Sequence, residues 1–216
     1  MTPRLFRDRT EAGRLLAARL EKYAGNPDVL VLALPRGGVP VAYEVAKALH
    51  PPMDVFIVRK LGIPGHEELA MGAVATGGVR VLNDQVVWVL AIPDYVIDAV
   101  ADWELHELER RERLYRGDRP PLDLTGRVAV IVDDGLATGA TALAAVEVAR
   151  RLGAVEVVLA VPVAAPDSLA RVRRAADLAV CPLAPPTFTA VSQFYSEFSQ
   201  VRDDEVISLL AEANLG

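Results

Sequence analysis

The sequence predicts an α/β fold in one domain over residues 1–216: a doubly wound, mainly parallel sheet flanked by helices. Short runs rich in β-branched residues alternate with alanine-rich helical segments, the pattern of strand–helix–strand units. The runs are apolar throughout, as expected for strands buried on both faces of a parallel sheet. With 216 residues, of which 52% are hydrophobic and 24% charged, the chain can bury one large core but is too short for two ordinary domains.

The predicted elements follow one another in a regular order. An amphipathic helix is expected first, over residues 10–24, because its apolar residues recur at helical spacing and Gly25-Asn26-Pro27 then stops it. Strands are expected at the apolar runs 29–34, 55–58, 128–132 and 155–161, and helices at 39–49 and 140–152. Ligands of such sheets bind beyond the carboxyl ends of the strands, so the residues after each run are the candidates for a site.

Two segments fall outside this alternation. Residues 94–116 carry a dense pattern of Glu and Arg, with pairs four residues apart such as Glu107 and Arg111, which predicts a long, largely solvated helix. Residues 183–200 gather most of the phenylalanines of a chain that is otherwise poor in aromatic residues. We expect this second segment to form a small C-terminal hood or flap.

Composition excludes several classes of partner. The formal net charge of −6 offers no broad basic surface for nucleic acid. No run reaches the roughly 18 apolar residues of a membrane helix, and the start of the chain lacks the pattern of a secretory signal. A single cysteine, Cys181, allows neither an intrachain disulfide nor a multi-cysteine metal site. We therefore expect a cytoplasmic protein, with Cys181 as a small core residue.

The most informative segment is VIVDDGLATGAT, residues 130–141, where an apolar strand runs through a turn of small residues into a helix. Small residues let backbone amides approach an anion at the N-terminus of the helix, and Thr138 and Thr141 add hydroxyl groups. Asp133 and Asp134 would repel a phosphate, but their carboxylates can accept hydrogen bonds from two vicinal hydroxyls. The segment therefore predicts a site for ribose 5-phosphate. A Walker loop is excluded because the chain has neither GKS nor GKT.

This string resembles the signature of type I phosphoribosyltransferases, in which four apolar residues precede two acidic ones and a Thr/Gly-rich phosphate loop. The resemblance extends over residues 29–161 and implies that the ligand is 5-phosphoribosyl-1-pyrophosphate (PRPP). Asp133 and Asp134 would then hold the ribose hydroxyls. The 5-phosphate would bind to the loop residues Ala137, Thr138, Gly139, Ala140 and Thr141.

A second motif, LPRGG at residues 34–38, follows the first predicted strand. Its glycines free the backbone to approach a polyanion, and Arg36 supplies charge. The place of this motif is similar to that of the pyrophosphate loop of the same family. The resemblance implies that Arg36, Gly37 and Gly38 bind pyrophosphate and that the turn contains a strained or cis non-proline peptide.

A third motif, Arg59-Lys60, follows the second predicted strand. Adenine phosphoribosyltransferases carry a similar Arg-Lys pair ahead of a mobile loop that closes over the pyrophosphate. The resemblance implies that Arg59 and Lys60 contact the pyrophosphate and that residues 61–72 form the mobile loop. The groups available on that loop are His66, Glu67 and Glu68, which equally fit a solvated loop with no catalytic role.

The resemblance also implies a reaction. In the family the bond from ribose C1 to pyrophosphate breaks first, and a nitrogen nucleophile captures the oxocarbenium-like centre. Mg²⁺ that bridges oxygens of PRPP would stabilise the leaving group, so we expect Mg²⁺ to be held through PRPP rather than by a protein cage. The expected catalytic residues are Asp133, Asp134, Lys60 and Arg36, and the expected assembly is a homo-oligomer, a dimer.

The acceptor is the part of the reaction that the sequence determines least. The hood segment around Phe194 and Tyr195 is similar to the aromatic segment that stacks on the purine in hypoxanthine-guanine enzymes, and a nucleobase acceptor would place the chain in purine or pyrimidine salvage. Residues 162–165, PVAA, lack the lysine that reads a 6-oxo group in those enzymes. Two other hypotheses stay open: a regulator that senses PRPP or a nucleotide without turnover, and another sugar-phosphate enzyme or hydrolase on the same frame. The absence of a GxSxG motif excludes only a serine hydrolase.

Overall fold

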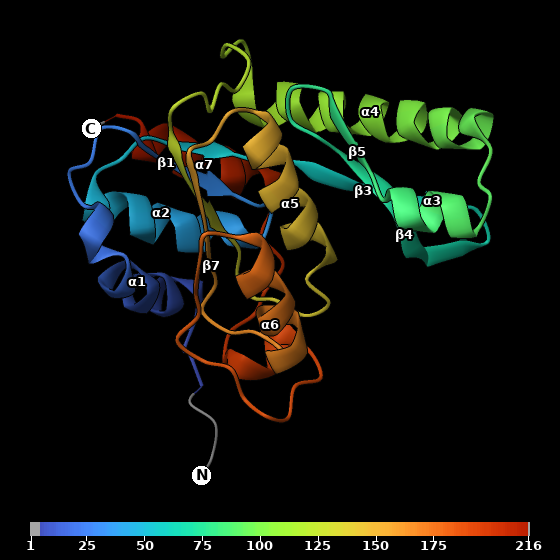
Figure 1. Ribbon diagram of the computed structural model, residues 1–216. Helices are drawn as coiled ribbons and strands as arrows, with labels where there is room; N and C mark the ends of the chain where they lie inside the picture. The colour runs from blue at the N-terminus through green and yellow to red at the C-terminus, as the bar shows by residue number, and fades with distance from the viewer. Residues whose placement is uncertain (1–4, 216) are drawn as a thin grey trace.

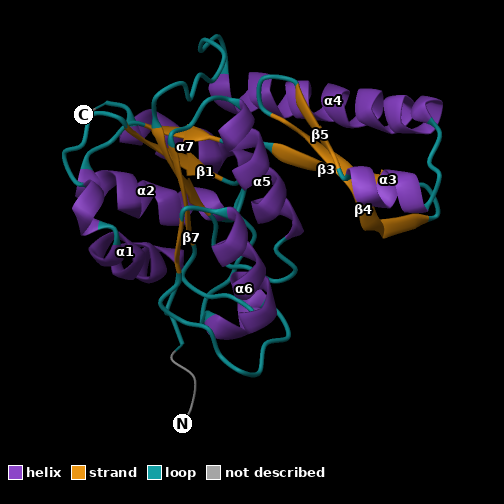
Figure 2. Ribbon diagram, in the orientation of Figure 1, coloured by secondary structure: helices purple, strands orange, loops and turns teal. Residues whose placement is uncertain are grey.

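The computed structural model describes residues 5–215, except for the side chains of Glu67 and Glu68. A parallel sheet of five strands runs in the order β2-β1-β6-β7-β8 and forms the centre of the molecule (Figures 1 and 2). Its strands are β1 Val29–Ala33, β2 Met53–Val55, β6 Val128–Val132, β7 Glu156–Ala160 and β8 Leu178–Val180. The predicted doubly wound α/β fold is therefore confirmed.

Alternate residues of the strands feed two hydrophobic clusters, one on each face of the sheet. Val29, Val31 and Ala33 of β1 pack with the helices on one face, whereas Leu30 and Leu32 pack with those on the other. The first face is covered by α1 Arg9–Arg19, α2 Gly38–Leu49 and α7 Asp203–Ala213, and the second by α5 Ala140–Arg151 and α6 Pro166–Ala175. Burial on both faces explains why the strands read as continuous apolar runs.

The helix expected over residues 10–24 is divided in two. α1 begins after the N-cap Asp8, whose side chain accepts the backbone N–H of Glu11, and ends at Arg19. A short 3₁₀ helix, η1 Glu21–Tyr23, completes the segment. Helices α6 and α7 and the short strand β8 were not predicted from the sequence.

The apolar run at residues 55–58 is not one strand. Val55 ends β2, whereas Val58 begins β3 Val58–Ile63 in a second sheet. Phe56 and Ile57, both fully buried, connect the two sheets. The Phe56 N–H donates to Ala33 O of the parallel sheet, and the Ile57 N–H donates to Oγ1 of Thr76, which directly follows β4 of the second sheet. The run is apolar because it passes through the core between two sheets.

The prediction of a loop over residues 61–72 is also wrong. This segment belongs to an antiparallel hairpin of β3 with β4 His66–Ala75, and β5 Val79–Leu82 adds a third strand. The base of the hairpin packs on the core, since Leu61 and Met71 are fully buried in the same cluster as the inner face of α4.

The second sheet and two helices form a projection that we call the arm. The arm comprises β3, β4 and β5 with α3 Asp84–Val89 and the N-terminal half of α4 Asp94–Arg116, and it extends away from the parallel sheet (Figure 1). α4 has the range expected for the long charged helix, and it buries Ile97, Ala101 and Leu108 against the hairpin and core. Among the described residues, no helix is both long and apolar enough to cross a membrane.

Candidate active site

A cleft of about 350 Å³ lies beyond the carboxyl ends of β1 and β6. These two strands pair directly, and the chain leaves β1 toward one edge of the sheet and β6 toward the other. This is the switch point at which doubly wound sheets bind their ligands. The cleft is lined by Arg9, Arg36, Gly37, Asp133, Asp134, Phe198, Ser199, Gln200 and Val201.

The LPRGG turn packs tightly against the two aspartates. A Cβ atom on Gly37 would collide with the Asp134 carboxylate, and one on Gly38 would lie 2.6 Å from Val132 O and 2.9 Å from Asp133 Cα. The Pro35–Arg36 peptide is cis, as the resemblance implies. Both glycines are thus required for this turn to approach the end of β6.

Asp134 is held by an arginine from the start of α1. Arg9 Nε donates to Asp134 Oδ2 at 2.8 Å, and Arg9 Nη1 donates to Ser199 O at 2.8 Å. The same guanidinium lies 3.9 Å from the centre of the Phe198 ring, a cation–π contact. The side chains of Arg9 and Asp134 are only 11% and 13% exposed. One cation therefore connects α1, the acidic pair and the hood.

Burial makes both carboxylates of the pair costly to ionise. Burial raises the pKa of Asp133 well above its ordinary value, and the neighbouring charge of Asp134 raises it further. Burial also raises the pKa of Asp134, while the charge and hydrogen bond of Arg9 oppose the rise. The Asp134 backbone N–H donates to Asp133 Oδ1 at 2.8 Å. Two adjacent carboxylates with this environment suit a ligand that brings hydrogen-bond donors or a cation.

The predicted phosphate loop, residues 137–141, leads into the N-terminus of α5. Gly139 is the N-cap and has φ +75°, in the left-handed region that glycine adopts without strain. α6 supports the loop from behind: Ser168 Oγ donates to Ala137 O at 2.6 Å, and Arg171 Nη2 donates to Thr138 O at 2.7 Å. Ala137 and Thr138 are exposed. The loop thus presents a braced helix N-terminus, a favourable place for an anion.

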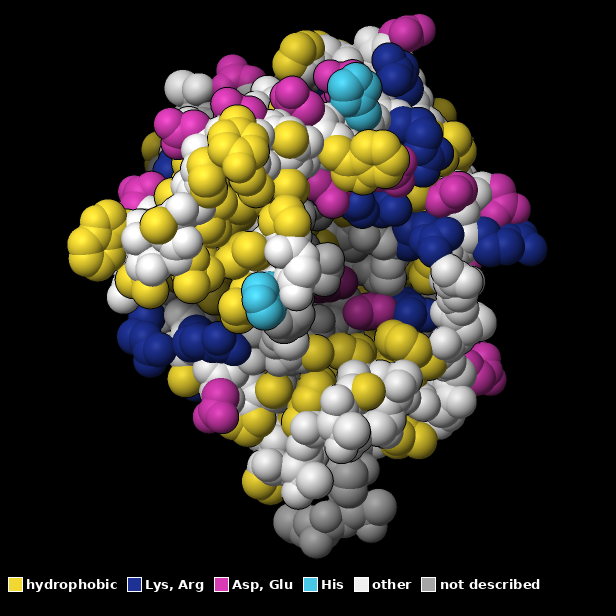
Figure 3. Space-filling view, turned by 90° about the vertical axis from the view of Figure 1, so that its right-hand side faces the viewer, with side chains coloured by type: hydrophobic (Ala, Val, Ile, Leu, Met, Phe, Trp, Pro, Cys, Tyr) yellow, Lys and Arg dark blue, Asp and Glu magenta, His cyan; other side chains and the backbone are white. Residues whose placement is uncertain are grey.

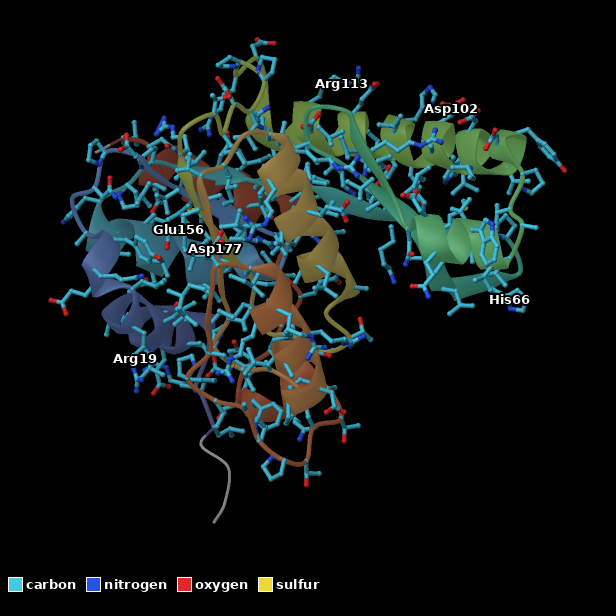
Figure 4. All side chains as sticks on the ribbon, viewed as in Figure 1. Arg19, His66, Asp102, Arg113, Glu156 and Asp177 are labelled. Atoms are coloured by element: carbon cyan, nitrogen blue, oxygen red, sulfur yellow. The ribbon has the colours of Figure 1, made fainter. Side chains whose placement is uncertain are left out.

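Arg59 and Lys60 of β3 point to opposite faces, because successive side chains of a strand alternate. Arg59 Nε donates to Glu104 of α4 at 2.6 Å, so its charge is already paired and it does not line the cleft. Lys60 is exposed. His66 lies exposed at the tip of the hairpin (Figure 4), and the side chains of Glu67 and Glu68 lie outside the described part of the structure.

The prediction that Phe194 and Tyr195 face the acceptor is wrong. Phe194 is fully buried and stacks on Phe188, and Tyr195 is 5% exposed within a third hydrophobic cluster that joins the hood to Phe6. The Tyr195 hydroxyl donates to Asp134 O at 2.6 Å, so Tyr195 fixes the backbone of the acidic pair. Phe198, four residues after Phe194, is the aromatic residue that lines the cleft.

Sequence reasoning missed Arg9, Phe198 and the support from α6. Arg9 and Asp134 are 125 residues apart, and no local pattern distinguishes Arg9 from its neighbours. α6 did carry a signal, since Pro166 stands at its first turn and Arg173 and Arg174 in its last. Cys181, expected as a core residue, is partly buried beside the core, and its thiol donates to Leu183 O.

The described residues contain no group of three or more His, Cys, Asp or Glu side chains that could hold a metal ion. The donors that the cleft does offer are the carboxylate oxygens of Asp133 and Asp134. Such hard oxygen donors fit Mg²⁺, which commonly takes one or two carboxylates and fills its other positions with water and substrate phosphates. The site therefore fits a Mg²⁺ ion that arrives with a phosphorylated ligand.

The fold and the cleft together define a doubly wound α/β protein with a carboxylate pair at the switch point of the sheet, followed in the chain by a small-residue turn into the N-terminus of α5. Residues 9–198 match the family described as "Phosphoribosyl transferase domain". The chain belongs to this family, which confirms the resemblance noted in the sequence.

Similar proteins agree with this assignment. Two proteins from strains of Mycobacterium tuberculosis, each provisionally named a phosphoribosyl transferase, are 54% identical over 211 residues, which is 98% of this chain. The chain spans about half of their length, 47%. A crystal structure of a protein from Thermus thermophilus is 41% identical and superposes with a TM-score of 0.87, covering 96% of this chain and 98% of that one.

Proposed function

We propose that the protein is an enzyme that transfers the 5-phosphoribosyl group from PRPP to a nitrogenous acceptor, with release of pyrophosphate. The observation that supports the proposal is the close packing of the LPRGG turn on Asp133 and Asp134 at the switch point of the sheet, with the turn into α5 following the two aspartates in the chain. PRPP has the matching order of groups, because its ribose hydroxyls lie between the pyrophosphate and the 5-phosphate. The proposal extends to a nucleobase as acceptor and to a role in nucleotide salvage.

Each group of residues has a defined task in this proposal. The amides and hydroxyls of residues 137–141 bind the 5-phosphate at the N-terminus of α5. Asp133 and Asp134 accept hydrogen bonds from the ribose hydroxyls and place negative potential beside the positive charge that develops at C1. Arg36, with the amides of Gly37 and Gly38, binds the pyrophosphate, and Lys60 is the candidate that reaches it from β3.

When bound together with PRPP, Mg²⁺ would neutralise the negative charge of the pyrophosphate leaving group. Asp133 and Asp134 are the residues that would hold this ion. Arg36 would contribute to the same neutralisation as a cation that lines the cleft. Its side chain is 36% exposed, and its Nη1 atom lies 3.7 Å from Asp203 Oδ1 at the start of α7.

The acceptor would enter from the hood side, where Phe198 to Val201 line the cleft. Phe198 offers an aromatic face, and Arg9 covers part of it. An aromatic face stacks on any planar base, so the cleft favours a planar acceptor over an aliphatic amine. We propose Phe198 for the task that the sequence suggested for Phe194 and Tyr195.

The proposal is tested by following pyrophosphate release with PRPP, Mg²⁺ and a panel of purine and pyrimidine bases, together with calorimetric PRPP binding. The double variant Asp133→Asn, Asp134→Asn should lose both release and PRPP affinity. Asp204→Asn, which changes an exposed carboxylate outside the cleft, should lose neither. Tight PRPP binding without release for any acceptor would instead support a PRPP-sensing regulator on the same fold. Unchanged PRPP binding in the double variant would contradict the assigned site.

A further inference from the structure

The turn that carries the predicted phosphate loop rests on one face of α6, which lies beside α5 (Figure 1). Three successive carbonyl oxygens of the turn accept hydrogen bonds from α6 and its N-cap: Leu136 O from the Ala165 N–H at 2.8 Å, Ala137 O from the Ser168 hydroxyl at 2.6 Å and Thr138 O from Arg171 Nη2 at 2.7 Å. The three donors recur every third residue, so they follow one another along a single face of the helix.

These hydrogen bonds determine where the following amides point. In a trans peptide the C=O group and the next N–H group point in opposite directions, and the peptides of this turn are trans. The N–H groups of Ala137, Thr138 and Gly139 are therefore directed away from α6. Within the part of the chain that the structure describes, none of the three donates a hydrogen bond. Successive backbone N–H groups directed to one side are the feature that backbone anion sites share.

Ser168 is covered by the turn that it supports. It is 3% exposed, and a Cβ atom on Gly139 would lie 3.4 Å from its own Cβ. Its hydroxyl also accepts Arg171 Nη2 at 3.1 Å, so the two side chains form one hydrogen-bonded pair beneath the turn. The packing of α6 on the sheet comes from Leu169 and Val172 instead. Ser168 and Arg171 thus contribute to α6 mainly through the carbonyl groups that they hold.

The other side of the turn is accessible. Ala137 and Thr138 are exposed. Figure 3 shows the molecule hollowed below the arm, with acidic and basic side chains around the hollow, so a charged ligand has room on this face of the molecule.

We infer that Ser168 and Arg171 are positioning residues for phosphate binding. By holding the carbonyl groups of Ala137 and Thr138, they keep the next amides directed at the 5-phosphate before the ligand arrives. Donors that are already oriented bind more tightly, because binding then does not have to order a glycine-containing turn. The inference rests on the 5-phosphate site proposed above. It does not rest on turnover, because ribose 5-phosphate tests it without an acceptor.

Ser168→Ala is the sharpest test, since it keeps Cβ, changes no charge and removes a hydroxyl that is buried under the turn. Calorimetry should show the Kd for ribose 5-phosphate raised by roughly fivefold or more, the equivalent of one hydrogen bond. The Kd for inorganic pyrophosphate, assigned to the LPRGG turn, should stay unchanged. The matched control is Ser208→Ala, which removes the hydroxyl that donates to Glu212 at 3.2 Å on the exposed side of α7. It should change neither Kd.

The exposed Arg171 supplies a second test that does not depend on the folding of Ser168→Ala. Arg171→Met should weaken ribose 5-phosphate binding at least as much, and Arg171→Lys should recover part of the loss, because an ammonium group can still donate to Thr138 O. Arg173→Met removes the same charge from another side of α6, since residues two apart do not face the same way. It should change the Kd by less than about twofold.

The outcomes separate this inference from the proposed reaction. Equal affinity of wild type and Ser168→Ala for ribose 5-phosphate overturns it, as does an equal loss for ribose 5-phosphate and pyrophosphate, which would indicate a merely structural role. Arg171→Met that binds as well as Arg173→Met also overturns it. A wild-type chain that binds no ribose 5-phosphate overturns the inference together with the 5-phosphate site. The expected losses in a chain that releases no pyrophosphate with any acceptor would support the positioning role and contradict only the transferase reaction.

Discussion

Replacement of Arg9 by methionine removes three contacts at once: the ion pair with Asp134, the hydrogen bond to Ser199 O and the cation–π contact with Phe198. Methionine keeps much of the apolar stem, so the change acts mainly on charge. A hydrogen bond between charged groups contributes about 1.5 to 3 kcal/mol, and removal of one member of a buried pair costs about 3 to 5 kcal/mol. Since both side chains keep slight exposure, we expect a loss of about 3 kcal/mol in the free energy of unfolding.

Urea denaturation and thermal unfolding measure this loss. For a domain of this size about 3 kcal/mol corresponds to a fall of roughly 6 to 12 °C in Tm. Arg202→Met is the matched control, because Arg202 pairs with Asp204 on the surface, where the side chains are 76% and 67% exposed; it should cost less than about 0.5 kcal/mol. If Arg9→Met were no more destabilising than Arg202→Met, the reasoning about the buried pair would be refuted.

The same variant has a pH dependence with a definite sign. Burial raises the pKa of Asp134 in the folded protein, and Arg9 opposes this rise. A carboxyl group with a raised pKa favours the folded state at low pH, and that stability is lost as the pH rises through the folded pKa. Without Arg9 the pKa rises further, so the difference in stability between Arg9→Met and wild type should be large near neutrality and should shrink toward about pH 4. A difference that is constant with pH would contradict the assignment to Asp134.

Three further outcomes are expected. Gly139→Ala and Gly77→Ala should each cost about 1 to 2 kcal/mol, because both glycines have positive φ, +75° and +83°; only Gly139→Ala should also weaken PRPP binding in calorimetry, by about tenfold. Burial raises the pKa of Tyr115 to about 12, and its hydrogen bond to Asp203 contributes further. The wild-type protein should therefore lose stability as the pH rises from about 10 through that value. In urea denaturation, Tyr115→Phe should not show this alkaline loss. Phe198→Leu should raise the KM of the acceptor with PRPP affinity unchanged; equal weakening of both would argue against an acceptor contact.

The parts of the fold that can be predicted from the sequence are those whose pattern lies in consecutive residues. The strands Val128–Val132 and Val29–Ala33 are nearly uniform apolar runs, and each is followed at once by a glycine-containing turn and an alanine-rich helix. The acidic pair and the predicted phosphate loop belong to one such unit, so their proximity follows from chain order alone. The LPRGG turn is brought to them by the pairing of β1 with β6, which a parallel sheet makes a natural expectation.

The long helix of the arm was predicted, but the hairpin of the arm and the orientation of the aromatic residues in the hood could not be, because their patterns depend on where the core ends. The run at residues 55–58 crosses from one sheet to another, and only the partners of Phe56 and Ile57 reveal the division. In the hood, Phe194 and Phe198 look alike in the sequence. One is fully buried against Phe188, and the other lines the cleft. Nothing local decides which ring turns inward.

Arg9 connects the local features that the sequence predicts with the hood, whose side-chain positions it does not predict. The predicted phosphate loop and the acidic pair are local features of the segment between β6 and α5, and the hood is a separate segment near the end of the chain. The Arg9 guanidinium donates to Asp134 and to Ser199 O and lies on the Phe198 ring, so the acidic pair and the hood share one cation. A change at Arg9 should therefore act on the acidic pair and on the hood together.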